Sequence, residues 1–334
     1  MVDHADITTA IRRAARQDAA YVAELAMAIC KVPAPTGLEL DRSRFVSSVI
    51  NDLGYAVTGD DVGNVYVRRG TKGGNVLMLA AHLDTVFPAD TSLEVERSAG
   101  RMSGPGIGDN SLGIAAVIGL FSMLDALQIE TSIDLLFVAD VGEEGLGNLR
   151  GMRTAVERFQ DSLAAVVAVE GHNLGRVTHT GVGSVRWRLR SMGPGGHSWG
   201  AFGQPSAIHA LAAVIADIAS IDVPDEPRTT FNVGVISGGT SVNTIAAEAV
   251  ADLDMRSVDP GSLEQLSAQV RAIIGRYEAP PLRIEIETIG ERPAGILDAE
   301  HPLVQIACDA VSWAGAEPTL DASSTDANVP LSRG

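Results

Sequence analysis

Cysteines, aromatic residues and basic residues are all scarce in this sequence. Its 334 residues include two cysteines and 4% aromatic residues, and 25 Lys and Arg stand against 42 Asp and Glu. Because the cysteines form no Cys-x-x-Cys pair, a disulfide framework and a thiolate zinc site are both excluded. The formal net charge of −17 disfavours nucleic acids and anionic membrane surfaces as partners, since both are themselves negatively charged.

Long apolar runs are also missing. No run reaches the length of about 18 residues that a membrane span needs, and the N-terminal residues contain no apolar core of a signal peptide. The sequence therefore predicts no membrane contact and a cytoplasmic location. Hydrophobic residues make up 46% of the chain, which is enough for a sizeable core, and the length suggests two domains.

The first half of the chain alternates apolar runs with helical patterns. Continuous apolar runs are typical of strands that are buried on both faces of an α/β sheet. The expected strands are 65–67, 76–81, 133–139 and 164–169, and the expected helices are 19–32, 40–53 and 111–127. We therefore predict a doubly wound mixed sheet in residues 1–178, to which residues 292–334 return with a helix near 301–314.

The pattern changes near residue 180. Residues 185–190 alternate strictly between apolar and basic side chains, which indicates a strand with one wet face. Further strands near 230–236, 247–256 and 282–288 and helices near 205–220 and 261–277 complete the order β-α-β-β-α-β. That order is the ferredoxin-like α+β pattern, so residues 179–291 are predicted to form an inserted second domain.

His82 and Asp84 stand where an apolar strand pattern ends. Ligands of open α/β sheets bind at the carboxyl ends of the strands. In an extended backbone the two side chains share a face, and a carboxylate behind a metal-bound imidazole orients the ring. The alternative is a buried histidine with a local aspartate partner.

A glycine-rich loop at 104–108 precedes Asp109. A dinucleotide fingerprint would need glycine in place of Asp109, and the loop lies too far behind its strand, so a nucleotide-dependent enzyme has only weak support. Such a loop can instead hold the Asp109 carboxylate ahead of a helix. The plainer alternative is a turn with Asp109 as the helix N-cap.

Two further strands end in carboxylates. Glu143 and Glu144 follow the run 133–139, and their mutual repulsion predicts a raised pKa or a bound cation. One natural arrangement gives Glu144 to a metal and leaves Glu143 as the general base for a metal-bound water. Glu170 ends the run 164–169 in the same way. Solvated acidic turns are the alternative for both motifs.

These strand and loop ends bring one histidine and several carboxylates to one edge of one sheet. Nitrogen and oxygen ligands without thiolates are typical of a catalytic zinc site. The combination therefore favours a metal-dependent enzyme over the separate alternatives.

The chain resembles the dizinc family of aminoacylases, acetylornithine deacetylases, succinyl-diaminopimelate desuccinylases and carboxypeptidases, metallopeptidase family 20. The matching motifs span nearly the whole chain in the family's order. They are His82-Leu83-Asp84, Gly104 to Asn110, Glu143-Glu144-Gly145, Glu170, Gly195 to Ser198, Gly238-Gly239 with Asn243, and Asp254-Met255-Arg256.

The resemblance implies a set of metal ligands. His82, Asp109 and Glu170 would hold one zinc ion, and Asp109 would bridge to a second zinc that Glu144 also binds. Cobalt and manganese are alternatives to zinc. The peptide after Asp109 would be cis, and Asp84 would orient His82.

The resemblance also implies the remaining roles. Glu143 would take a proton from the bridging water and pass it to the leaving amine. The inserted domain would be the family's lid and dimerisation domain, so we expect a homodimer. Its His197 would donate to the tetrahedral intermediate, while Asn243 and Arg256 would hold the substrate. A bare loop histidine is the alternative for His197, and a surface ion pair is the alternative for Arg256.

The family's last zinc ligand is a histidine that follows a stretch like 324–328, whereas this sequence reaches Gly334 without such a residue. The family's final strands and helix are missing as well. We therefore expect a truncated or degenerate member whose second zinc site is one ligand short. His301 stands in a different context, and His172 and His179 are the remaining substitutes.

The predicted function is zinc-dependent hydrolysis of a peptide or N-acyl amide bond in a small peptide or N-acyl amino acid. The stretches 84–88 and 196–200 are similar to the family's peptidase members, which favours a peptidase over a small-metabolite N-deacylase. Because the last histidine is missing, a catalytically impaired member that binds peptide-like ligands stays open.

Overall fold

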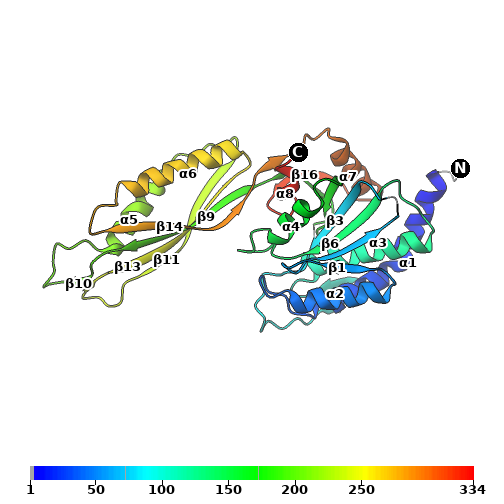
Figure 1. The fold of residues 1–334 in the computed structure, drawn as a ribbon, viewed down its shortest axis with the longest axis horizontal. Coiled ribbons are helices and arrows are strands. Elements are labelled where there is room, and N and C mark those ends of the chain that lie inside the picture. The colour runs from blue at the N-terminus through cyan, green and yellow to red at the C-terminus, as the bar shows by residue number, and fades with distance from the viewer. Residues whose placement is uncertain (1–3, 72, 172) are drawn as a thin grey trace. The chain divides into compact units, whose positions relative to one another are not determined.

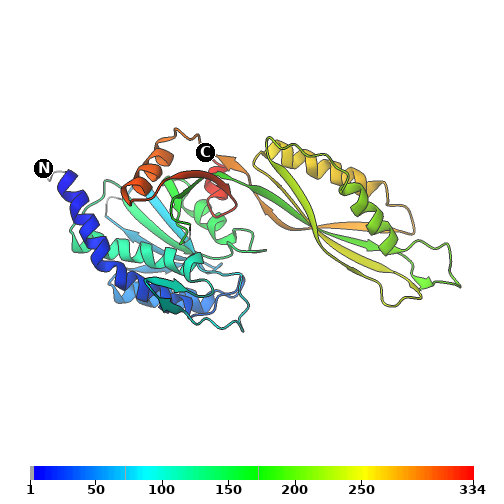
Figure 2. The ribbon, with the colours of Figure 1, turned by 180° about the vertical axis from the view of Figure 1, so that it is seen from behind.

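The structure is a computed structural model that describes residues 4–71, 73–171 and 173–334. Its contacts divide the chain into two units, whose elements are drawn in Figures 1 and 2. Unit 1 comprises the chain up to Val177 with Pro302–Leu320 and Thr325–Pro330, and unit 2 comprises Thr178–His301, Asp321–Ser324 and Leu331–Gly334. The sequence analysis assigned all of 292–334 to the catalytic domain, whereas the contacts divide that stretch between the two units.

A five-stranded mixed sheet forms the centre of unit 1. Its strand order is β1-β2-β6-β3-β7, with β3 parallel to both β6 and β7, while β2 runs antiparallel to β1 and β6. The strands are β1 (Val57–Gly59), β2 (Val65–Arg69), β3 (Val76–His82), β6 (Asp134–Asp140) and β7 (Leu163–Ala168). All seven residues of β6 are buried, as its continuous apolar run predicted.

Helices cover both faces of this sheet, so the predicted doubly wound α/β architecture is confirmed. Leu79 and Ala81 of β3 belong to one apolar cluster with residues of α1, α2 and α3. Met78 and Ala80, on the opposite face, belong to another cluster with residues of α4 and α8. The helices are α1 (His4–Cys30), α2 (Leu40–Asp52), α3 (Gly113–Ala126), α4 (Arg150–Phe159), α7 (Pro302–Trp313) and α8 (Asn328–Leu331).

One helical stretch of unit 1, Ile107–Ala126, is long and apolar enough to cross a membrane by length and composition. Of its most apolar window, 67% is buried inside the structure. Ile114, Val117 and Phe121 belong to the apolar cluster under the sheet. The stretch therefore has the character of a core helix, which passes the same test of length and composition.

Unit 2 contains a four-stranded antiparallel sheet in the order β11-β13-β9-β14. Two helices pack on one face of it, and their residues share an apolar cluster with the inward side chains of β9 and β13. The elements are β9 (Gly183–Met192), α5 (Ala207–Ile218), β11 (Thr229–Gly238), β13 (Glu248–Ser257), α6 (Pro260–Gly275) and β14 (Arg283–Arg292). Chain order and sheet order together give the predicted ferredoxin-like fold.

Several short elements were not predicted. They are β1, α4, β4 (Glu96–Ser98), β5 (Arg101–Ser103), β8 (Arg176–Gly181), β10 (Gly196–His197), β12 (Thr244–Ile245), β15 (Gly295–Ile296), β16 (Thr319–Ser323), α8 and a π-helical turn η1 (Ile107–Leu112). Helix α1 begins at His4 rather than near residue 19, because its first turns are rich in Ala and Arg, which favour a helix without an apolar stripe.

Candidate metal centre

The parallel strands of unit 1 bring the predicted ligands to one edge of the sheet. In the register of β3 with β6, His82 lies opposite Asp140, and Ala80 of β3 lies opposite Ala168 of β7. The three strands thus end at the same edge, and the loops after β6 and β7 carry Glu143 with Glu144 and Glu170 there.

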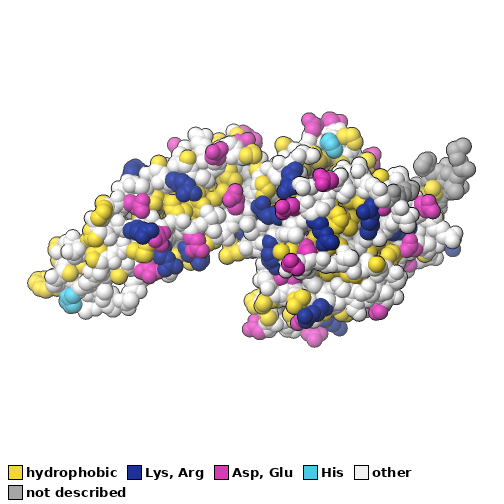
Figure 3. Space-filling model, in the orientation of Figure 1, with side chains coloured by type: hydrophobic (Ala, Val, Ile, Leu, Met, Phe, Trp, Pro, Cys, Tyr) yellow, Lys and Arg dark blue, Asp and Glu magenta, His cyan; other side chains and the backbone are white. Residues whose placement is uncertain are grey.

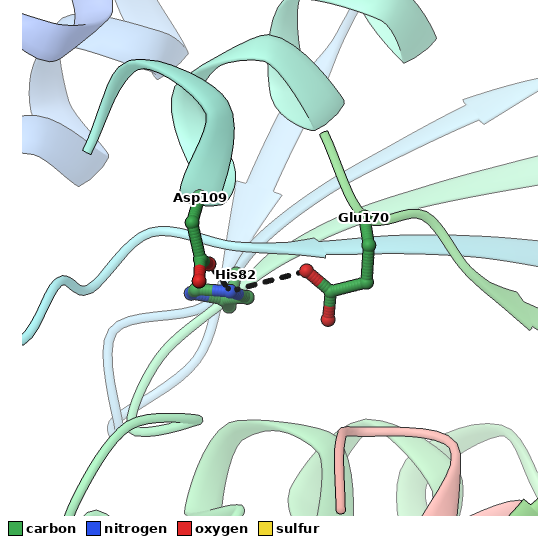
Figure 4. Close-up of side chains that lie close together, drawn as sticks. All are labelled: His82, Asp109 and Glu170. Carbon is green, nitrogen blue, oxygen red and sulfur yellow. Dashed lines mark ion pairs between the residues drawn. The ribbon is translucent and has the colours of Figure 1, made fainter. Parts of the chain in front are cut away.

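His82, Asp109 and Glu170 form one group of candidate ligands at this edge (Figure 4). His82 Nε2 lies 3.0 Å from Asp109 Oδ1 and 3.7 Å from Glu170 Oε2. One ligand atom from each residue lies within 4.8 Å of the others, a spacing that suits a shared metal ion. A second group with the same spacing joins His82 to Glu143 and Glu144.

The sequence prediction gave Asp84 the task of orienting His82, and both its backbone carbonyl and its carboxylate lie near the ring. The Nδ1 atom of His82 lies 3.0 Å from the backbone carbonyl oxygen of Asp84 and 3.6 Å from its carboxylate. The Asp84 carboxylate also accepts hydrogen bonds from the backbone N–H groups of Glu143 and Glu144, both at 2.9 Å, and from Thr36 Oγ1 at 2.8 Å. The carbonyl and the carboxylate of Asp84 thus both lie near His82 Nδ1, and the carboxylate also holds the backbone of the Glu143–Glu144 turn.

Asn110 braces the loop that carries Glu170. Its side-chain Nδ2 donates to the carbonyl of Val169 at 2.8 Å, and its Oδ1 accepts from the N–H of Gly171 at 3.0 Å. The peptide between Asp109 and Asn110 is cis, as the family resemblance implied. A Cβ atom on Gly113 would lie 2.1 Å from Asn110 Oδ1, so this close approach requires glycine. The sequence analysis quoted Asn110 but gave it no role.

Arg42 holds the backbone next to His82, a role that was not predicted from the sequence. Its guanidinium is fully buried and donates to the carbonyls of Leu83 and Val32, both at 2.8 Å. Burial lowers the pKa of Arg42 to about 10. A signal was present, since Arg42 precedes Val46 and Ile50 at four-residue spacing on the buried stripe of α2.

The acids at this edge repel one another. Burial, followed by the charges of Glu143 and Asp109, raises the pKa of Glu144 to about 7. Burial likewise raises the pKa of Asp140 to about 7, and it raises the pKa of Asp326 well above its usual range. Burial opposes a charge on His82, but the facing carboxylates raise its pKa well above 6.5. A positive charge is therefore favoured at this edge.

His197 and Asn243 come together in unit 2. His197 lies in β10, opposite Thr244 of β12, and the N–H of Ser198 donates to the carbonyl of Asn243 at 3.0 Å. Arg256 lies near the end of β13, where its Nε donates to Asp254 Oδ2 at 2.7 Å. The ion pair that the sequence analysis left open for Arg256 is therefore present.

Of the histidines considered for the missing ligand, His179 and His301 lie in the described residues and take no part in the two ligand groups. His179 Nδ1 lies 2.8 Å from the carbonyl of Leu297 in unit 2, and His301 is exposed. His172 lies outside the described residues. Within the described ranges, His82 is the one imidazole of both groups.

Two family models match consecutive parts of the chain. "Peptidase family M28" matches residues 64–178, and "Peptidase dimerisation domain" of the M20 type matches residues 180–280. A "Peptidase M20 domain-containing protein" of Schizosaccharomyces pombe is 27% identical over 289 residues, which cover 81% of this chain and 62% of that protein. The chain is therefore similar to peptidases of the M20 type over both of these parts.

Other M20-related proteins carry several activities in their names. A succinyl-diaminopimelate desuccinylase of Bordetella avium is 26% identical over 266 residues, which cover 73% of this chain and 70% of that protein. Among solved structures of similar fold, aminopeptidase PepT of Bacillus cereus has a TM-score of 0.75 and 21% identity, covering 94% of this chain and 87% of that chain. A Bacillus subtilis dinuclear metal-binding peptidase of the M20 family has a TM-score of 0.66 and 13% identity, covering 94% and 86%. These likenesses show the shared fold.

Proposed function

We propose that this chain is a metal-dependent hydrolase that cleaves a peptide or N-acyl amide bond. The observation that carries the proposal is the meeting of His82, Asp109 and Glu170 with the Glu143–Glu144 pair at one sheet edge. The chain spans 62% of the length of its Schizosaccharomyces pombe relative, which is named a peptidase-domain protein. The activity of the whole protein is therefore part of the proposal.

The donor set fits a divalent cation. One imidazole and several carboxylates suit zinc, with cobalt or manganese as alternatives, and the raised pKa of Glu144 reflects a negative charge that a cation would offset. His82, Asp109 and Glu170 would hold one ion, and Asp109 with Glu144 would hold the second. When bound, such ions polarise a carbonyl and make a water molecule more acidic.

Glu143 is the proposed general base. The residue is 6% exposed, its backbone N–H donates to the Asp84 carboxylate, and one of its carboxylate oxygens lies within 4.8 Å of ligand atoms of His82 and Glu144. It would take a proton from the attacking water and deliver it to the leaving amine. His197 would donate to the developing oxyanion, and Asn243 and Arg256 would hold the substrate.

The proposed substrate is a small peptide or an N-acyl amino acid. A peptidase is favoured over a small-metabolite deacylase by the residues around Asp84 and His197, although relatives of both kinds match the chain. The dimerisation-domain match supports a homodimer through unit 2. A cytoplasmic location stays a prediction of the sequence.

The test measures bound metal by elemental analysis and hydrolysis of a panel of dipeptides and N-acyl amino acids. We expect metal-dependent turnover in the parent, and Glu143→Gln should keep the metal while kcat falls about 10²- to 10⁴-fold. Equal turnover in both proteins would remove Glu143 as the base.

A binding protein without turnover is the second candidate. His82 belongs to both three-residue groups. If it binds one metal ion, the second group keeps only two of its described ligands, and this observation favours the second candidate. Peptide binding with a single metal and no hydrolysis would support this candidate against the first.

A further inference from the structure

The ring of His197 is held by the turn that follows it. The backbone N–H of Trp199 points to His197 Nδ1 at 3.2 Å, and that of Gly200 does so at 3.4 Å. The carbonyl of His197 accepts from the N–H of Ala201 at 2.9 Å, which closes the turn. Both hydrogen bonds to the ring therefore end on the same nitrogen.

Glycines allow the chain to fold back here. Gly195 has φ +68° and Gly196 has φ +147°, values that other residues rarely adopt. A Cβ atom on Gly196 would lie 2.8 Å from the Cβ of Ala201, so the turn could not close on a larger residue. The Gly-Gly-His motif thus serves the placement of the ring.

We infer that this turn fixes His197 as the tautomer with its proton on Nε2, so that the ring presents an N–H donor to the substrate. A nitrogen that accepts two N–H groups must carry a lone pair, and a neutral imidazole then carries its proton on the other nitrogen. The side chain is exposed, and among the described residues none accepts a hydrogen bond from Nε2.

His82 provides the opposite case within the same chain. Its Nδ1 faces the Asp84 carbonyl and must donate, so Nε2 is the nitrogen that would give up its proton to ligate a metal ion. A lone pair suits a metal ion, whereas an N–H suits an oxyanion. The backbone around each histidine therefore selects the tautomer that its proposed partner requires.

The backbone amides of Trp199 and Gly200 are positioning groups in this scheme, and the role of the donor rests on the proposed hydrolysis. The indole itself is 89% exposed, so its ring is not needed for the turn. Trp199→Phe keeps the amide N–H, whereas Trp199→Pro removes it.

The first experiment reads the tautomer directly, without activity. The full chain is labelled with ¹⁵N-histidine, and long-range ¹H–¹⁵N correlation distinguishes the protonated nitrogen of each neutral ring, with His197→Gln identifying the His197 signals. We expect a protonated Nε2 in the parent and in Trp199→Phe, and a mixture of tautomers in Trp199→Pro. A protonated Nδ1 in the parent would overturn the inference.

The second experiment tests the donor role of His197 Nε2 separately from the proposed hydrolysis. A glutamine amide places N–H near the position of Nε2, whereas an asparagine amide reaches only the position of Nδ1. We therefore expect His197→Gln to retain about tenfold more kcat than His197→Asn, with similar KM values. Equal loss in both variants would overturn the donor role. Absence of turnover in the metal-loaded parent would instead count against the proposed hydrolysis, while the tautomer result would stand.

Discussion

Charged residues are arranged in opposite ways in the two units. At the sheet edge of unit 1, one imidazole faces several carboxylates, and the pKa of Glu144 rises to about 7. On the sheet of unit 2, by contrast, several acids face bases across neighbouring strands. Arg188 binds Asp252 at 2.8 Å, Arg186 binds Asp254 at 2.9 Å, and the pKa of Asp252 is lowered by Arg188.

The surface of unit 2 reflects this pairing, because basic and acidic side chains lie side by side on the face that Figure 3 draws. Paired charges satisfy each other and need no ligand, whereas the repulsion in an acid cluster with raised pKa values is relieved by bound protons or by a cation. The direction of the pKa shift therefore separates a binding site from a structural ion pair, although both are rich in charge.

The largest effect is expected when the His82 imidazole is removed from unit 1. In His82→Ala the metal should be lost below detection, because the two ligand groups share this residue. Elemental analysis after gentle purification measures the outcome. His179→Ala is the matched control, since the Nδ1 atom of His179 is engaged with the carbonyl of Leu297, and it should bind metal as the parent does. Undiminished metal in His82→Ala would contradict the assigned ligand set.

A substitution of Asp84 tests how the Glu143–Glu144 turn is oriented, without removing a proposed metal ligand. In Asp84→Asn one carboxylate oxygen becomes an NH2 group that cannot accept, so one of the N–H groups of Glu143 and Glu144 loses its acceptor while the backbone carbonyl still faces His82. We expect kcat to fall about 10- to 100-fold with the metal retained. Thr36→Val removes one hydrogen bond from the same carboxylate and should have a smaller effect. A larger loss in Thr36→Val than in Asp84→Asn would refute this reading.

The acid cluster also predicts how the metal-free protein responds to pH. Asp140 and Glu144 have pKa values raised to about 7, so between about pH 4 and 7 the native state binds more protons than the unfolded state. The free energy of unfolding should therefore fall as pH rises through this window. Thermal unfolding in chelator at pH 5, 6 and 7 measures the trend. Asp140→Asn should weaken it, and a rising midpoint in the parent would contradict it.

The smallest effect belongs to unit 2. In Asp252→Asn the pair with Arg188 is lost, but both side chains are partly exposed, so solvent replaces most of the interaction. We expect the midpoint of thermal unfolding to change by at most about 2 °C, with metal content unchanged. A change as large as that of a buried substitution would mean that surface pairing contributes more than this comparison allows.

The sequence could predict the sites that lie at the ends of buried strands. His82, Glu143 and Glu170 follow continuous apolar runs, and parallel pairing then brings them together without further information. The ferredoxin-like order of unit 2 was readable for a similar reason, because its alternating strands and amphipathic helices are long.

The supports of the site could not be predicted in the same way. Asn110 bonds to residues 59 and 61 positions away, and Arg42 bonds to a carbonyl 41 positions away, so no local pattern reports these contacts. Sequence spacing predicted that Asp84 lies beside His82, but it could not distinguish the Asp84 carbonyl, 3.0 Å from Nδ1, from the carboxylate at 3.6 Å. Helix α4 was missed because it is short and begins among glycines.

The discontinuity of unit 1 has a consequence for the order of events during synthesis. Most of unit 2 is one continuous stretch, Thr178–His301, whereas unit 1 also needs Pro302–Leu320 and Thr325–Pro330. Chains emerge from the ribosome N-terminus first. All the main strands of unit 2 are therefore synthesised before α7 and α8, the last helices of unit 1. We therefore expect nascent chains stopped after residue 301 to protect unit 2 from proteases while Val156 of α4, which packs in one cluster with Val329, stays accessible.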